Sequence, residues 1–200
     1  MNRIAIFGGT FNPIHNGHLH IAQQFEKQLH MQRLLFIPTF VPPHKQISDL
    51  APAEDRLEMC RLACLGTSYE VSDLEIRRGG PSYTADTLAE LKQNNPGTEL
   101  YFITGEDMFL TLEQWYQPEL IYSLATICAA PRSTDGVDKL HAYAKRLAAH
   151  GARVILQNID YLPVSSTMVR DAVRQGRSID ALVPPRVAHY IQENGLYQRN

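Results

Sequence analysis

The chain has 200 residues, a formal net charge of −2 at pH 7 and 44% hydrophobic residues. A chain of this length folds as about one domain and buries roughly 70% of its unfolded surface, so it needs no disulfides. The charge gives no global attraction to nucleic acid, and the sequence shows no long apolar segment, charged leader or lipidation motif. We therefore expect a single cytoplasmic domain over residues 1–200, without nucleic-acid or membrane partners and with a homo-oligomer left open.

The first predicted strand is the apolar run at residues 4–7, which ends in Gly8 and Gly9. This pattern is typical of a buried parallel strand that enters a tight turn. Glycines lack the Cβ atom that would keep a phosphate away from main-chain N–H groups. Residues 16–29 are apolar at helical spacing and predict a helix. A strand, a glycine turn and a helix together favour anion binding.

His15 and His18 lie three residues apart at the start of this predicted helix. Their side chains share one helix face, at the end where the helix dipole favours negative charge, so both rings can reach one phosphate. A purely structural pair is the alternative. A zinc site would need a third ligand, and no Asp, Glu or Cys lies near the pair before Glu26.

Further apolar runs alternate with helical patterns along the chain. Strands are predicted at residues 33–37, 69–76, 99–104, 124–130 and 154–156, and helices at residues 53–65, 137–150 and 182–195 and after residues 82–84 and 163–167. This alternation predicts an α/β fold: a Rossmann-like, doubly wound, mainly parallel sheet of about six strands with helices on both faces. We expect a core over about residues 1–160 and a short C-terminal helical part over about residues 161–200 that closes the site.

Cysteine usage is consistent with a reducing compartment. Cys60 and Cys64 lie four residues apart in an apolar-periodic segment, and Cys128 makes the set odd. Buried free thiols are expected here, rather than a disulfide or a metal site.

Polar and aromatic residues follow several predicted strands, at the sheet edge where ligands collect in open α/β folds. Two prolines stiffen the loop that carries His44 and Lys45. Gly105 follows the fourth strand, and Asp107 can contact a sugar or cap the next helix. Any positive potential for an anionic ligand must be local, with Lys45, Arg132 and Arg170 as candidates.

Three other segments have a structural interpretation beside a functional one. Residues 82–84 and 165–167 place hydroxyl side chains where helices begin, which is ordinary N-capping chemistry. The N–H groups at the second of these segments can instead bind phosphate oxygens beside the guanidinium of Arg170. Trp115 is either part of the core or, with Tyr116, a surface on which a flat ring stacks.

These motifs together resemble the nucleotidyltransferase superfamily with the H-x-G-H motif. Residues 8–18, Gly-Gly-Thr-Phe-Asn-Pro-Ile-His-Asn-Gly-His, are similar to the signature of the bacterial nicotinate mononucleotide adenylyltransferases. The Pro-Pro-His-Lys loop at residues 42–45, the aromatic pair at 115–116 and Val-Ser-Ser-Thr-Met-Val-Arg at 164–170 follow in family order. Val164 and Val169 replace isoleucines of the family pattern, which is a conservative departure.

The resemblance implies an enzyme of NAD biosynthesis that transfers AMP from ATP to nicotinate mononucleotide, giving the deamido form of NAD and pyrophosphate. The attacking phosphate is anionic near pH 7, so we expect direct in-line attack with no covalent enzyme intermediate. Mg²⁺ is expected to arrive with ATP, without a metal ligand from the protein. The sequence leaves open whether nicotinate or nicotinamide mononucleotide is preferred.

The same resemblance implies roles for individual residues. The implied catalytic residues are His15, His18 and Arg170. The implied ATP-binding residues are Gly8, Gly9, Thr10, Phe11, His15, His18, Gly105, Asp107, Ser165, Ser166, Thr167 and Arg170. The implied residues for nicotinate mononucleotide are Asn12, His44, Lys45, Tyr83, Thr84, Trp115, Tyr116 and Arg132.

Other functions fit the sequence less well. Pantetheine-phosphate adenylyltransferases and cytidylyltransferases share the superfamily, but the 42–45 loop and the aromatic pair at 115–116 favour the nicotinate enzymes. A dehydrogenase or passive dinucleotide-binding module would carry G-x-G-x-x-G, which is absent, as is a Walker A motif. An RNA-binding relative would need a basic face, which the sequence lacks.

Overall fold

The structure, a computed structural model, describes residues 2–43, 49–131 and 136–198. The described residues form one sheet of six parallel strands in the order β3-β2-β1-β4-β5-β6. The strands are β1 (Arg3–Gly9), β2 (Arg33–Pro38), β3 (Glu70–Val71), β4 (Glu99–Gly105), β5 (Ala125–Ala130) and β6 (Arg153–Leu156). The order reverses between β1 and β4, as in a doubly wound Rossmann-like sheet, so the predicted fold class is confirmed.

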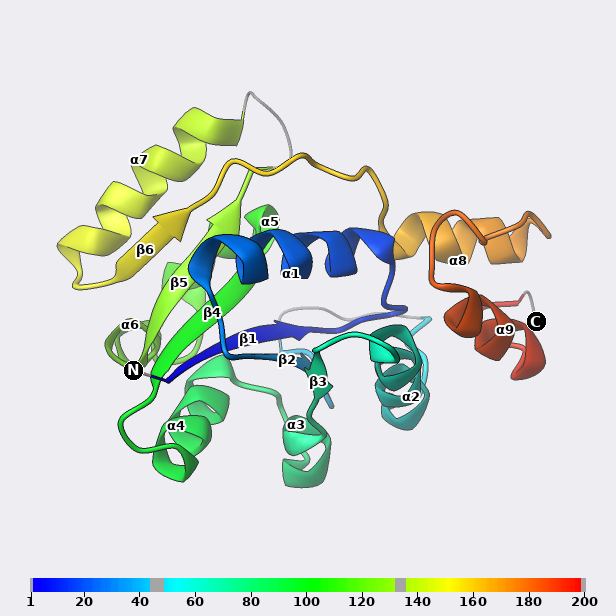
Figure 1. The fold of residues 1–200 in the computed structure, drawn as a ribbon, viewed down its shortest axis with the longest axis horizontal. Coiled ribbons are helices and arrows are strands. Elements are labelled where there is room, and N and C mark those ends of the chain that lie inside the picture. The colour runs from blue at the N-terminus through cyan, green and yellow to red at the C-terminus, as the bar shows by residue number, and fades with distance from the viewer. Residues whose placement is uncertain (1, 44–48, 132–135, 199–200) are drawn as a thin grey trace.

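Helices cover both faces of this sheet (Figure 1). They are α1 (Asn16–Leu29), α2 (Ala53–Cys64), α3 (Leu74–Arg78), α4 (Thr84–Asn94), α5 (Glu106–Phe109), the 3₁₀ helix η1 (Leu112–Gln114), α6 (Pro118–Leu124), α7 (Gly136–Ala149), α8 (Ser166–Arg174) and α9 (Pro185–Glu193). Helices α8 and α9 lie at the end of the molecule opposite the N-terminus, beyond the carboxyl end of β1 (Figure 1). Residues of the described ranges form no helix with the length and apolar character needed to cross a membrane.

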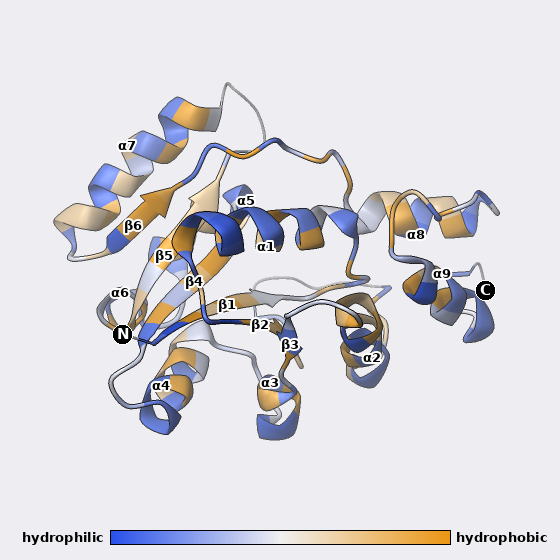
Figure 2. Cartoon of the chain, viewed as in Figure 1, coloured by the Kyte–Doolittle hydropathy of each residue, from blue (hydrophilic) through white to orange (hydrophobic). Residues whose placement is uncertain are grey.

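The sheet divides the hydrophobic core into two layers. Ala5 and Phe7 of β1 pack in the layer that includes residues of α1, α2, α8 and α9, whereas Ile4 and Ile6 pack in the layer that includes residues of α4, α6 and α7. Successive side chains of a strand point to opposite faces, so a central strand buried on both faces must be a continuous apolar run. Figure 2 accordingly shows the central strands mainly hydrophobic and the helices mixed.

The third predicted strand is mostly wrong. Only residues 70–71 form a strand, and residues 74–78 form helix α3. The alternation of Leu74 and Ile76 favoured a strand. However, Asp73 is the N-cap of α3 and Arg77 lies in its last turn, where the Arg77 Nε donates to the Asp73 Oδ1 at 2.8 Å. An acidic start, a basic end and an i, i+4 ion pair favour a helical turn over a short edge strand.

The boundaries of the other helices and strands differ less from those predicted from the sequence. Strand β1 continues through Gly8 and Gly9, so the turn begins at Thr10 rather than at the glycines. Helix α9 spans residues 185–193 instead of the predicted 182–195, and the sequence reading did not anticipate α6. Cys60, Cys64 and Cys128 are free and buried as predicted, and burial raises the pKa of the Cys64 and Cys128 thiols to about 12.

Candidate active site

A pocket of about 490 Å³ opens at the carboxyl ends of β1 and β4. Gly8 and Gly9 from β1 and Gly105 from β4 line it, so the two glycine segments face one cavity. These strands flank the point at which the strand order reverses, and open parallel sheets bind ligands there because neighbouring loops diverge. The loop after β1, the start of α1 and the start of α8 also form part of the wall.

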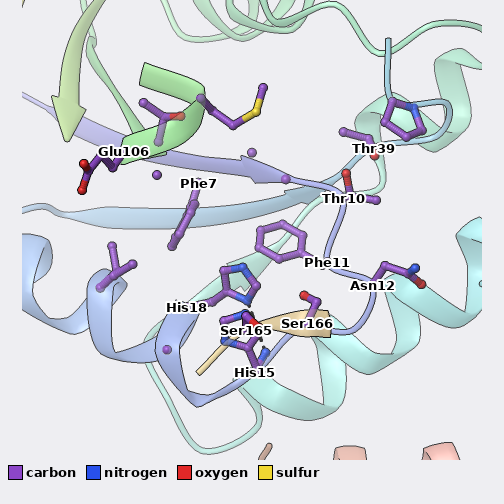
Figure 3. A pocket seen from close by; sticks show the side chains of 18 of the residues that line it. Phe7, Thr10, Phe11, Asn12, His15, His18, Thr39, Glu106, Ser165 and Ser166 are labelled. Carbon is purple, nitrogen blue, oxygen red and sulfur yellow. Dashed lines mark hydrogen bonds between the residues drawn. The ribbon is translucent and has the colours of Figure 1, made fainter. Parts of the chain in front are cut away.

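The turn after β1 is shaped by Phe11. This residue adopts a φ of 47°, in the left-handed region that non-glycine residues rarely occupy. Its ring lies so close to Gly9 that a Cβ there would approach it to 3.1 Å. The Phe11 ring also makes an edge contact with the His18 ring, with centroids 5.0 Å apart (Figure 3). Gly9 therefore admits an aromatic side chain that supports the histidine.

The two histidines lie together, as their spacing predicted. Helix α1 has His15 at its N-cap, and the rings of His15 and His18 stack with centroids 3.6 Å apart (Figure 3). The main-chain N–H of His15 donates to the Nδ1 of His18 at 3.3 Å. An accepting Nδ1 leaves the proton of the neutral His18 ring on Nε2, from where it can be donated to an anionic oxygen.

Gly17, between these histidines, is required by close packing. A Cβ at this position would lie 3.0 Å from the Nδ1 of His15 and 3.1 Å from the carbonyl oxygen of Val164. A side chain here would therefore press on two buried residues, His15 and Val164. The glycine thus lets the segment before α8 approach the histidine pair.

The hydroxyl residues at the start of α8 cap the helix, tie it to the first loop and line the pocket. Ser165 is the N-cap, and its Oγ accepts the Met168 N–H at 3.2 Å. The Oγ of Ser166 donates to the Pro13 carbonyl at 2.8 Å and so ties α8 to the first loop. Both serines and Thr167 also line the pocket, where the N–H groups of a helix start can meet an anion.

Arg170 is held beside these hydroxyls. Its Nε donates to the Asp49 Oδ2 and its Nη1 to the Asn12 carbonyl, each at 2.8 Å. Asp49 also pairs with Arg174. Partial burial of Asp49 opposes ionisation, but the two guanidinium groups prevail and hold its pKa below the usual value. The sequence did not identify Asp49, whose role depends on partners more than 120 residues away.

Asn12 lines the pocket but uses its side chain within the protein. It is 3% exposed, and its Nδ2 donates to the Asp49 carbonyl at 3.1 Å. Its Oδ1 accepts from the Ala51 N–H at 3.0 Å and from the Tyr197 hydroxyl at 2.8 Å. In the structure Asn12 therefore connects the first loop to residues 49–51 and to Tyr197, which its position in the motif did not reveal.

On the β4 side of the pocket, Thr84 and Trp115 are lining residues. The Nε1 of Trp115 donates to the Thr111 hydroxyl at 3.2 Å, and its ring contacts Phe102 edge-on, so packing and pocket lining coexist. Tyr83 and Tyr116 do not line the pocket. Their rings stand against each other with centroids 4.4 Å apart.

Asp107 is exposed and is not one of the pocket-lining residues. Helix α5 begins at Glu106 with Gly105 as its N-cap, so the capping alternative for Asp107 is wrong. Glu106 lines the pocket instead (Figure 3). Three predicted site residues, His44, Lys45 and Arg132, lie outside the described residues.

Two buried charged residues near the pocket were missed by the sequence reading. Arg56 is 1% exposed, and its guanidinium donates to the main-chain carbonyls of Thr10, Thr39, Phe40 and Ala51 at 2.6–3.0 Å. Glu75 lines the pocket and accepts from the Thr87 hydroxyl at 2.6 Å; burial raises its pKa. The only available signal for Arg56 was a basic residue inside an apolar-periodic helix.

Within the part of the chain that is described, no group of three His, Cys, Asp or Glu side chains is arranged to hold a metal ion.

The chain was compared with known proteins. The family model described as "Cytidylyltransferase-like" matches residues 6–172. A "Probable nicotinate-nucleotide adenylyltransferase" of Dehalococcoides mccartyi is 41% identical over 199 residues, covering 98% of both chains. A protein of Geobacter metallireducens with the same description is 42% identical over 212 residues, again covering 98% of both.

Solved structures share the fold. The Plasmodium falciparum nicotinic acid mononucleotide adenylyltransferase complexed with NaAD superposes with a TM-score of 0.80 at 20% identity, covering 98% of both chains. The same parasite enzyme complexed with APC gives a TM-score of 0.77 at 19% identity, with the same coverage.

Proposed function

Because the chain belongs to the cytidylyltransferase-like family, we propose that it is a nicotinate-nucleotide adenylyltransferase (EC 2.7.7.18), which transfers AMP from ATP to nicotinate mononucleotide. The products are nicotinate adenine dinucleotide and pyrophosphate, in the biosynthesis of NAD. The observation that carries this proposal is a stacked histidine pair that lines the same pocket as the N-terminus of α8 and lies beside it. Full-length relatives at about 40% identity support the choice of acceptor.

The histidine pair is proposed to bind the α-phosphate of ATP. The Nε2 proton of His18 is supplied in a fixed orientation, because the ring is held by its Nδ1 bond and by Phe11. Charge that develops on the α-phosphate during displacement is then stabilised without reorganisation of the site. A single preorganised donor of this kind is worth roughly 100- to 1000-fold in rate.

The start of α8 is proposed to receive the leaving pyrophosphate. Ser165, Ser166 and Thr167 offer hydroxyl and main-chain N–H groups, and Arg170 adds a positive charge that Asp49 and Asn12 hold in place. The C-terminal part over about residues 161–200 thereby closes the ATP site. Gly8, Gly9, Thr10, Phe11 and Gly105 are proposed to contact ATP along the opposite wall, and the exposed position of Asp107 makes Glu106 the better candidate there.

No general base is required, because the attacking phosphate of the mononucleotide is already anionic. The protein supplies alignment for in-line attack, and no residue forms a covalent intermediate. Mg²⁺, carried on the ATP phosphates, neutralises their charge when it is bound. The buried free thiols support a reducing, cytoplasmic setting.

The acceptor is proposed to occupy the β4 side of the pocket. Trp115 offers an aromatic face for the nicotinate ring, and Thr84 stands at the start of α4, where N–H groups favour a carboxylate. Asn12, Tyr83 and Tyr116 are assigned to the mononucleotide from the resemblance. His44, Lys45 and Arg132 are assigned to the mononucleotide from the resemblance alone.

The test is pyrophosphate release with Mg-ATP and three acceptors assayed separately: nicotinate mononucleotide, nicotinamide mononucleotide and phosphopantetheine. We expect the nicotinate substrate to exceed the others by orders of magnitude, with nicotinate adenine dinucleotide identified by mass. Faster turnover of nicotinamide mononucleotide would overturn the acid preference, and turnover of phosphopantetheine alone would overturn the proposed acceptor class.

A further inference from the structure

The last described turn of the chain reaches back to the first loop. After α9, the hydroxyl of Tyr197 donates to the Oδ1 of Asn12 at 2.8 Å, across 185 residues of sequence. The ring of Tyr197 packs against the core layer that includes α1 and α2. Burial raises the pKa of Tyr197, so its hydroxyl remains a donor at all physiological pH values.

The backbone of Tyr197 is held in an uncommon conformation. Its φ is 63°, in the left-handed region that costs a non-glycine residue about 1 kcal/mol or more. Such a conformation persists where surrounding contacts determine it, and here these contacts are core packing and the bond to Asn12. The tail is therefore fixed at a defined position against the first loop.

Asn12 connects this tail to the proposed phosphate site. Its side chain bridges Tyr197 and the segment at Asp49, and its carbonyl accepts from the Nη1 of Arg170. The carboxylate of Asp49 binds the Nε of the same arginine. Tyr197, Asn12, Asp49 and Arg170 thus form one closed network, in which a shift of Asn12 changes two supports of the guanidinium.

A second tie holds the other end of the same loop. The N–H of Asn16 donates to the Leu182 carbonyl at 2.9 Å, and its Nδ2 donates to the Ala181 carbonyl at 3.1 Å. The C-terminal part is therefore hydrogen-bonded to the first loop at Asn12 and at Asn16, and His15 lies between these two residues in the sequence. The contact at Asn12 is the one that also reaches Arg170.

We propose that Tyr197 is a positioning residue for adenylyl transfer: its hydroxyl fixes Asn12, and through Asn12 it sets the orientation of Arg170 toward the leaving phosphates. This inference rests on the proposed function. Charge on the leaving group is greater in the transition state than in bound ATP, so a misaligned Arg170 lowers kcat more than it weakens ATP binding. A tyrosine that only anchors the tail would change stability and leave kcat unaltered.

Tyr190 supplies a matched control. Its hydroxyl also joins the C-terminal part to the rest of the chain, donating to the Oδ1 of Asp55 at 2.8 Å. Neither Tyr190 nor Asp55 lines the pocket. Tyr197→Phe and Tyr190→Phe therefore each remove one hydroxyl from the same region, and only the first touches the network at Asn12.

The experiment measures kcat, the KM for ATP and the melting temperature of both variants. We expect Tyr197→Phe to lower kcat about 3- to 10-fold, the effect of one hydrogen bond, with the KM for ATP changed less than about twofold. Tyr190→Phe should keep kcat within about twofold of wild type. Equal kcat values for Tyr197→Phe and wild type, or equal losses in the two variants, would overturn the inference.

A double-mutant cycle tests the route through Arg170. In an Arg170→Lys background, which lacks the guanidinium, Tyr197→Phe should cost less than about twofold in kcat. A full, additive loss there would show that Tyr197 acts by another route. If wild type prefers a different mononucleotide acceptor, the proposed function fails, and the ratios of kcat measured with that acceptor still decide the role of Tyr197.

Discussion

Replacement of Arg56 by methionine should destabilise the protein while keeping most of the packed volume of the side chain. The guanidinium donates to four main-chain carbonyls: those of Thr10 after β1, Thr39 and Phe40 after β2, and Ala51 before α2. No carboxylate is within ion-pair distance of it among the described residues. The side chain therefore acts as a buried hydrogen-bond hub that holds the loop after β1 against both ends of the loop between β2 and α2.

The magnitude follows from the groups that lose their partner. Each buried carbonyl left without a donor costs about 1–3 kcal/mol. The loss is reduced because water can reach some of these loops and because the variant no longer buries a charge. That burial is costly, and it lowers the pKa of Arg56. We expect a net loss of about 3 kcal/mol in the free energy of unfolding, or roughly 6–12 °C in Tm for a chain of this size.

Thermal and denaturant unfolding measure this loss, with Arg61→Met as the control. Arg61 lies on the same helix, has a side chain 53% exposed and pairs with Glu58 at 3.5 Å, so its replacement should cost about 0.5 kcal/mol or less. Arg56→Lys should also be destabilised, because one ammonium cannot span four carbonyls. A Tm for Arg56→Met within about 2 °C of that for Arg61→Met would refute the reasoning.

Three further outcomes are expected. His18→Ala should retain the wild-type Tm within a few degrees and lose roughly 100- to 1000-fold in kcat. The control His189→Ala changes an exposed histidine and should keep wild-type turnover. Near-normal activity of His18→Ala would remove this residue from the mechanism. Asp49→Asn should cost about 1 kcal/mol or less in denaturant unfolding at pH 7. Because Arg170 and Arg174 lower the Asp49 pKa against the effect of partial burial, the ion pair stabilises the fold fully above the usual aspartate pKa of about 4. The difference from wild type should shrink and vanish as the pH falls through the lowered pKa of Asp49. The three cysteines should resist iodoacetamide at pH 8 in the native state and react on unfolding, because burial raises their thiol pKa values; rapid native labelling would contradict their burial.

Much of the fold was predictable because its signals are local. A strand buried on both faces must be apolar along its length, as residues 4–7 and 100–103 are, and the intervening helical spacing implies parallel connections. The exception, residues 69–76, is too short for its alternation to outweigh the charges that favour the turn at α3. Short edge elements depend on neighbours that the sequence pattern does not specify.

The candidate site also has a part that local sequence signals predicted and a part that they did not. The spacing of His15 and His18 placed both rings on one face of a helix start, and parallel strand order placed the glycine segments at one sheet edge. Both follow from backbone geometry over a few residues, or from the shared direction of the strands. The sequence by itself therefore determined that the glycine segments of β1 and β4 and the histidine pair would line one pocket at the carboxyl edge of the sheet.

Only the tertiary structure decided which side chains hold that site in place. Asn12 bonds to Tyr197 near the other end of the chain, and Asp49 pairs with arginines more than 120 residues away. In the sequence Arg56 looks like an ordinary basic residue, and only the fold brings two loops against its guanidinium. Hydrophobic periodicity and secondary-structure propensity depend on a residue and its near neighbours in the sequence. The hydrogen-bond partner of a buried polar side chain can come from a distant segment, and only the folded structure shows which segment lies beside it.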